Sequence, residues 1–79
     1  MNKFKLKVIE QKINKLYERT NFMFFIEYKK NGVLNDYTLR FKYKNQGPLL
    51  YIDSLIFKDN LEENVIQYMI ENSIKRVFT

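Results

Sequence analysis

The fold is decided by the stretch Tyr37-Thr38-Leu39-Arg40-Phe41-Lys42-Tyr43-Lys44, in which apolar and polar side chains alternate strictly. A period of two is typical of a β-strand with one buried side and one side that faces solvent. The polar side of this strand carries Arg40, Lys42 and Lys44 in succession. Such a row of cations either keeps a sheet soluble or binds an anionic partner, and the pattern alone leaves both alternatives open.

The segments around this strand predict two helices and two further strands. Apolar residues at helical spacing predict amphipathic helices over residues 3–19 and about 61–77. Strands are predicted over residues 22–30 and 49–57, and the central strand is expected to end at about Lys44. The turns between the strands are predicted at Asn31-Gly32 and at Asn45-Gln46-Gly47-Pro48.

The register of the first hairpin depends on the length of its loop. A tight turn places Ile26 opposite Tyr37, whereas a four-residue loop places Ile26 opposite Leu39. Both registers keep the same side chains on the same face, because a shift by two residues preserves parity. We expect the longer loop, because it also sets Lys29 opposite Asp36, which carries the opposite charge.

The second hairpin has a similar choice. A four-residue loop pairs Phe41 with Ile52 on one face and Arg40 with Asp53 on the other. A loop of five residues would bury Asp53 among aromatic side chains without a partner, which is costly. We therefore expect the four-residue loop, with Asp53 on the solvent side of the sheet.

Parity then divides the strand residues between two faces of the sheet. The inner face is apolar and must be covered by both helices, the second of which is predicted to be capped by Asn60 together with Glu63. We predict one α+β domain over residues 1–79, a two-layer sandwich of α-β-β-β-α order with a three-stranded antiparallel meander and both helices on one face. The outer face is expected to carry Met23, Phe25, Glu27, Lys29, Thr38, Arg40, Lys42, Lys44, Leu49, Tyr51, Asp53 and Leu55.

The composition argues against several classes of protein. Cysteine and histidine are both absent, so the chain lacks thiolate metal ligands and the usual general base. No acidic pair has a catalytic spacing and no glycine-rich phosphate loop is present, so we expect neither an enzyme nor a cofactor. The longest apolar run is Phe22–Ile26 and the N-terminus does not resemble a signal peptide. We therefore expect a soluble cytoplasmic protein that does not bind membranes.

The outer face of the sheet and the first helix form the candidate binding surface. Residues 1–47 carry eleven cations and four anions, whereas residues 48–79 carry three and five. Aromatic rings interleaved with cations suit single-stranded nucleic acid, a protein partner, or a second copy of the chain in a homodimer. The residues predicted to bind the partner are Phe25, Lys29, Arg40, Lys42, Lys44 and Tyr51 on the sheet, with Lys5 and Lys12 on the first helix.

The element order is similar to that of the double-stranded RNA-binding domain. That family binds phosphates with a basic run that opens its second helix, where this chain has Asn60-Leu61-Glu62-Glu63, so we expect no duplex RNA on that surface. Several small phage inhibitors, including some anti-CRISPR proteins, also pack helices on a three-stranded sheet. Phe, Ile, Lys, Tyr and Asn, whose codons are AT-rich, supply 41 of the 79 residues, as is typical of AT-rich genomes and mobile elements.

These patterns together predict a small non-enzymatic binding protein. We expect an inhibitor or adaptor of a phage or other mobile element that occupies the surface of a protein partner or nucleoprotein complex. The alternative is direct binding of nucleic acid through the same face of the sheet.

Overall fold

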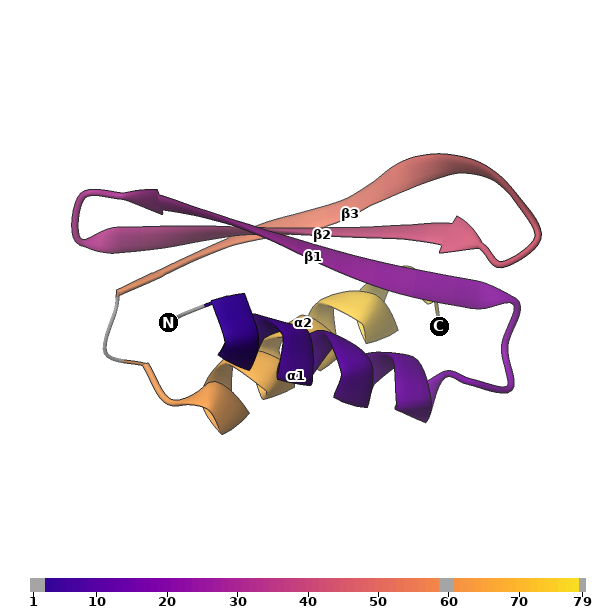
Figure 1. The fold of residues 1–79 in the computed structure, drawn as a ribbon, viewed down its shortest axis with the longest axis horizontal. Helices are drawn as coiled ribbons and strands as arrows, with labels where there is room; N and C mark the ends of the chain where they lie inside the picture. The colour runs from indigo at the N-terminus through magenta and orange to yellow at the C-terminus, as the bar shows by residue number, and fades with distance from the viewer. Residues whose placement is uncertain (1–2, 59–60, 79) are drawn as a thin grey trace.

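The computed structural model describes residues 3–58 and 61–78 of the chain, and it confirms the predicted fold class. Its elements follow one another in the order α-β-β-β-α (Figure 1). Their bounds are α1 Lys3–Leu16, β1 Phe22–Asn31, β2 Leu34–Tyr43, β3 Gln46–Lys58 and α2 Glu63–Phe78.

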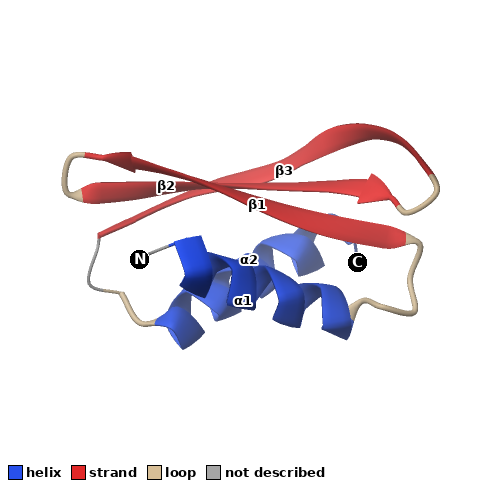
Figure 2. Ribbon diagram, viewed as in Figure 1, coloured by secondary structure: helices blue, strands red, loops and turns tan. Residues whose placement is uncertain are grey.

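The molecule has two layers. The strands form one antiparallel sheet in the order β1-β2-β3, and both helices lie on the same side of it (Figure 2). Helix α1 packs mainly against β1, whereas α2 packs against β3 and against α1. The opposite face of the sheet is therefore left without a helix over it.

The expected register of the first hairpin is confirmed. Ile26 pairs with Leu39 and Lys29 pairs with Asp36. The loop is shorter than expected, however, because the strands continue to the pair Asn31–Leu34 and leave only residues 32 and 33 in the turn. Gly32 has a φ of +65°, which glycine adopts without strain, and no other described residue of this turn has a positive φ. This combination is typical of a type II′ turn.

The expected register of the second hairpin is wrong. Asp53 pairs with Leu39 and Tyr51 pairs with Arg40, so Ile52 is an extra residue in β3 and forms a β-bulge. The bulge turns Asp53 to the inner face, where we expected it to lack a partner. It has two partners instead, because Ser73 Oγ donates to its Oδ2 at 3.0 Å and Arg76 Nη2 lies 3.3 Å from the same oxygen.

The bulge also reverses the faces of the rest of β3. Leu55 pairs with Tyr37 and packs against the core, whereas we expected Leu55 on the outer face. Phe57 is buried on the inner side as well. Ile56 consequently points outward, and 61% of its surface is exposed.

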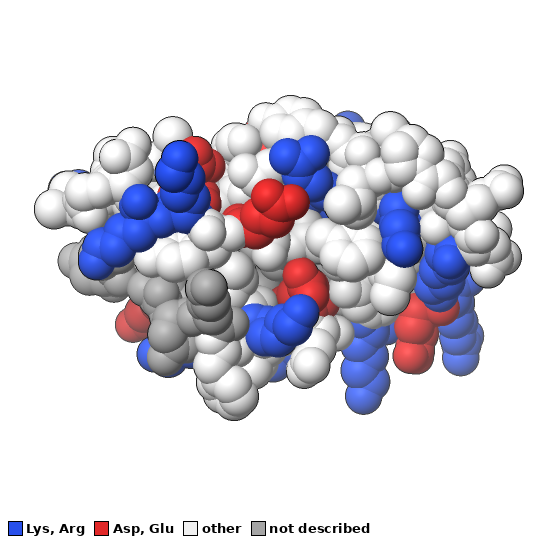
Figure 3. Space-filling view, turned by 45° about the horizontal axis from the view of Figure 1, so that its top comes forward, with Lys and Arg blue, Asp and Glu red and all other residues white. Residues whose placement is uncertain are grey.

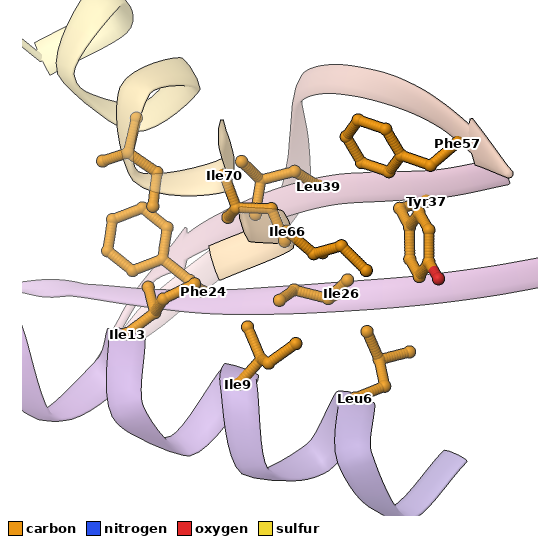
Figure 4. Close-up of a cluster of buried hydrophobic side chains, with 11 residues drawn as sticks. Leu6, Ile9, Ile13, Phe24, Ile26, Tyr37, Leu39, Phe57, Ile66 and Ile70 are labelled. Atoms are coloured by element: carbon orange, nitrogen blue, oxygen red, sulfur yellow. The ribbon is translucent and has the colours of Figure 1, made fainter. Parts of the chain in front are cut away.

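The core fills the space between the sheet and the helices. Figure 4 shows Leu6, Ile9 and Ile13 of α1 pointing toward Phe24 and Ile26 of β1. The remaining members of the buried cluster come from β2, β3 and α2, and they are Tyr37, Leu39, Phe57, Ile66, Ile70 and Ile74. Because every element contributes to this one cluster, the helices and the sheet hold each other in place.

Helix α1 ends at Leu16, three residues before the expected end at residue 19. The last α-type hydrogen bond runs from Tyr17 N to Ile13 O, and the tighter bonds from Glu18 N to Lys15 O and from Thr20 N to Tyr17 O then close the helix. Bonds of this shorter span are common where a helix ends.

Helix α2 buries a somewhat different face from the one we expected. Its buried residues are Ile66, Ile70, Ser73 and Ile74. The helical spacing of the apolar residues in the sequence predicts that Val65, Met69 and Val77 share the buried face, but all three are exposed. The predicted cap Asn60 lies outside the described residues. Because Ile66 N donates to Glu62 O, the helix begins at Glu63, which is therefore its first residue and not the third that a capping box requires.

Candidate binding surface on the open face of the sheet

Large apolar side chains are exposed on the face of the sheet that carries no helix. Tyr51 is 59% exposed and Leu49 is 47% exposed, and Met23 on the opposite edge strand is 41% exposed. Ile56 is exposed on the same face, so this face carries apolar side chains as well as cations. Exposed apolar side chains gathered on one face indicate an interaction site.

A row of three side chains crosses the centre of this face. Phe25 of β1 pairs with Arg40 of β2, and Arg40 pairs with Tyr51 of β3. We call this set the Phe25–Arg40–Tyr51 row. Arg40 Nε lies 3.1 Å from Glu27 Oε1, and the Tyr51 hydroxyl donates to Ser54 Oγ at 3.1 Å. Arg40 is therefore flanked in the sheet by two aromatic residues, and an acidic side chain lies beside its guanidinium.

The other cations of this face lie beside aromatic or acidic residues of the neighbouring strand. Lys42 Nζ lies 5.6 Å from the centroid of the Phe25 ring, within the range of a cation–π contact. Lys29 pairs with Asp36 across the first hairpin. In Figure 3, which turns the sheet toward the viewer, blue side chains are separated by white and red ones. The charge on this side is thus interspersed and does not form a continuous basic track.

Three of the predicted partner-binding residues lie away from this face. Lys44 follows the end of β2, and its Nζ donates to the carbonyl oxygen of Glu18 at 2.6 Å. This hydrogen bond connects the end of β2 to the segment that follows α1. Lys5 and Lys12 are exposed on α1, in the other layer. The structure therefore brings Phe25, Lys29, Arg40, Lys42 and Tyr51 together and separates Lys5, Lys12 and Lys44 from them.

The structure also changes which residues of β3 belong to this face. Asp53 and Leu55 leave it, and Ser54 and Ile56 take their places. The sequence contains no local signal for this exchange, since it follows from contacts of Asp53 with Ser73 on α2.

Neither a metal site nor a membrane-spanning helix is found in the described residues. Among residues 3–58 and 61–78, no group of three acidic side chains is placed to hold a metal ion. Within the same ranges, neither helix combines the length and apolar character needed to cross a membrane.

Comparison with known protein families, with curated proteins and with solved structures finds no match for this chain.

Proposed function

We propose that this protein is a non-enzymatic binding protein whose open sheet face attaches to a partner protein, with the Phe25–Arg40–Tyr51 row at the centre of the contact. The observation that carries the proposal is this row on a face that no helix covers, with Tyr51 exposed and Phe25 and Arg40 half-buried. Tyrosine and arginine are enriched among the residues that dominate binding energy, and phenylalanine is enriched at interfaces.

The surroundings of the row favour a protein over a nucleic acid as the partner. Protein interfaces combine an apolar centre with a charged rim, and here Met23 and Leu49 lie beside the row while Lys29 and Ile56 lie farther out. A nucleic-acid surface needs cations that neutralise successive phosphates. Glu27 already lies beside Arg40, which lowers the attraction of this face for phosphate.

The role that fits such a surface is that of an inhibitor or adaptor, which acts by occupying a partner. The chain has 79 residues and a lysine-rich and asparagine-rich composition of the kind encoded by AT-rich phages and mobile elements. A cytoplasmic location accords with the absence of cysteine. The partner is a protein of the cell, either alone or in a nucleic-acid-handling complex.

Two tyrosine variants test the proposal. Tyr51→Ala removes a ring from the row, whereas Tyr68→Ala removes a ring that is 64% exposed on α2, in the other layer. A partner is first captured from cell extract with the unmodified protein, and its affinity for each purified variant is then measured by calorimetry. We expect Tyr51→Ala to weaken binding by about 2 kcal/mol, roughly thirtyfold, and Tyr68→Ala to leave it unchanged.

Three results would contradict the proposal. Equal affinity of the two tyrosine variants would show that the partner binds elsewhere. Retention on single-stranded DNA or RNA that falls steeply with salt, with no protein partner, would indicate direct nucleic-acid binding. A dimer in light scattering that Tyr51→Glu converts to a folded monomer would show that the face binds a second copy.

A further inference from the structure

The two edges of the sheet differ in their backbone hydrogen bonding. At the β1 edge, side chains of α1 take the place of a neighbouring strand. Asn14 accepts from Phe24 N at 2.8 Å and donates to Phe24 O at 2.9 Å, and Glu10 Oε2 accepts from Ile26 N at 2.8 Å. These backbone groups are no longer offered to another chain, so the β1 edge is closed to strand addition along this part.

The β3 edge has no such cover in the part of the chain that the structure describes, where β2 is its one neighbour in the sheet. Ser54 N donates to the side chain of Asp53 at 2.8 Å and so points away from β2. Residues 53–58 keep a constant register, so backbone groups alternate in direction along them. The amides of Ile56 and Lys58 therefore point outward as well.

A groove runs beside this open edge, between β3 and α2. Its volume is about 550 Å³, and it is lined by Leu55, Met69, Asn72, Lys75 and Arg76. The floor is thus apolar and the rim of α2 is basic.

Two carboxylates on the elements that form the groove are engaged with other residues. The Asp53 carboxylate accepts from Ser54 N through Oδ1 and from Ser73 Oγ through Oδ2, where it also meets Arg76. Glu71 contacts Gln67, which lies on the side of α2 that faces α1. Lys75 and Arg76 line the groove and the Asp53 carboxylate lies beside them, so these three side chains carry two positive charges and one negative charge, an excess that favours an anionic ligand.

We propose that the β3 edge binds an extended acidic segment of a partner protein, which adds to the sheet as a strand. Its backbone pairs with the outward groups of Ile56 and Lys58, as in other cases of strand addition. Its apolar side chains cover Leu55 and Met69, and its carboxylates face the cations of α2. A second copy of this chain fits less well, because it would bring the same cations against this edge.

This edge site is separate from the Phe25–Arg40–Tyr51 row, and the two proposals fail independently. A library of random peptides displayed on phage is selected on the immobilised full-length protein. We expect the enriched peptides to carry both apolar and acidic residues at every second position, on the side of the added strand that faces α2. Binding of a synthetic copy should slow amide exchange at Ile56 and Lys58 and leave the amides of Phe24 and Ile26 unchanged.

A matched pair of charge reversals identifies the contribution of the groove. Lys75→Glu places an anion on the groove, whereas Lys15→Glu makes the same change on α1. We expect Lys75→Glu to weaken binding of the synthetic peptide at least about tenfold and Lys15→Glu to leave it unchanged. Circular dichroism verifies that both variants are folded. The exchange experiment uses the unmodified protein, so its result does not depend on the folding of a variant.

Several results would overturn the inference. In the selection, these results are the enrichment of no peptide and the enrichment of peptides without acidic residues. In the exchange experiment, the contrary result is protection of amides at the open face or at β1. Equal effects of the two charge reversals, or a dimer that forms through β3, would also contradict it. Loss of peptide binding in Tyr51→Ala with normal binding in Lys75→Glu would assign the peptide to the open face instead.

Discussion

Replacing Asn14 by alanine tests whether α1 side chains satisfy the β1 edge. The Asn14 amide makes two hydrogen bonds to the backbone of Phe24, a residue that is only 1% exposed. Its removal leaves a buried N–H and a buried C=O unpaired, at about 1–3 kcal/mol each. Alanine recovers up to about 0.7 kcal/mol through its higher helix propensity. Water that enters the vacated space restores part of the pairing, so we expect a net loss in the lower part of this range, about 2–3 kcal/mol.

Urea denaturation of the purified variant measures this loss directly. The control is Asn64→Ala, the same substitution at an exposed position of α2, which should change the free energy of unfolding by less than about 0.5 kcal/mol. A chain of this length is stabilised by roughly 4–12 kcal/mol, so the Asn14 effect is measurable. Equal effects of the two substitutions would refute the reasoning, since they would show that the β1 edge does not depend on the Asn14 amide.

Further stability predictions follow from the faces of the sheet and from its turns. Phe41→Ala should lower the free energy of unfolding by about 3 kcal/mol, the low end for phenylalanine, because the ring is partly exposed. Lys42→Ala should lower it by less than about 0.5 kcal/mol. Equal melting temperatures of the two variants would show that the faces are misassigned. Asp53→Ala should cost about 1–3 kcal/mol in urea denaturation because it leaves the buried Ser73 hydroxyl without this acceptor, and a neutral effect would remove that role. Gly32→Ala should cost about 1–2 kcal/mol because of its positive φ, whereas an unchanged midpoint would mean that the turn rearranges.

The first hairpin could be predicted because its information is local. From Tyr37 to Tyr43 the apolar residues of β2 occupy one parity only, and the two loop lengths differ by a shift of two residues, so either gives the same buried face. The choice between registers then rested on one charge pair, Lys29 with Asp36, and the structure has that pair. Only the length of the loop was wrong, because the strands pair closer to the turn than the sequence pattern indicates.

The second hairpin could not be predicted in the same way. Residues 49–52 and 55–57 are apolar at both parities, so alternation does not identify the buried face of β3. The decision depends on Asp53, whose partners Ser73 and Arg76 lie 20 and 23 residues later in the chain. For α2 the ambiguity is similar, because Val65 and Ile66 are adjacent and apolar and only one of them is buried.

The bulge at Ile52 determines which side chains of β3 lie on the open face of the sheet. If the register of residues 53–58 continued without it, Ile52 would pair with Arg40 and Tyr51 would turn to the inner face. The extra residue instead places Tyr51 opposite Arg40 on the open face. Bulges are known to redirect side chains in this way. Because α2 holds Asp53 beside the bulge, the helix layer determines which side chains the opposite face of the sheet presents.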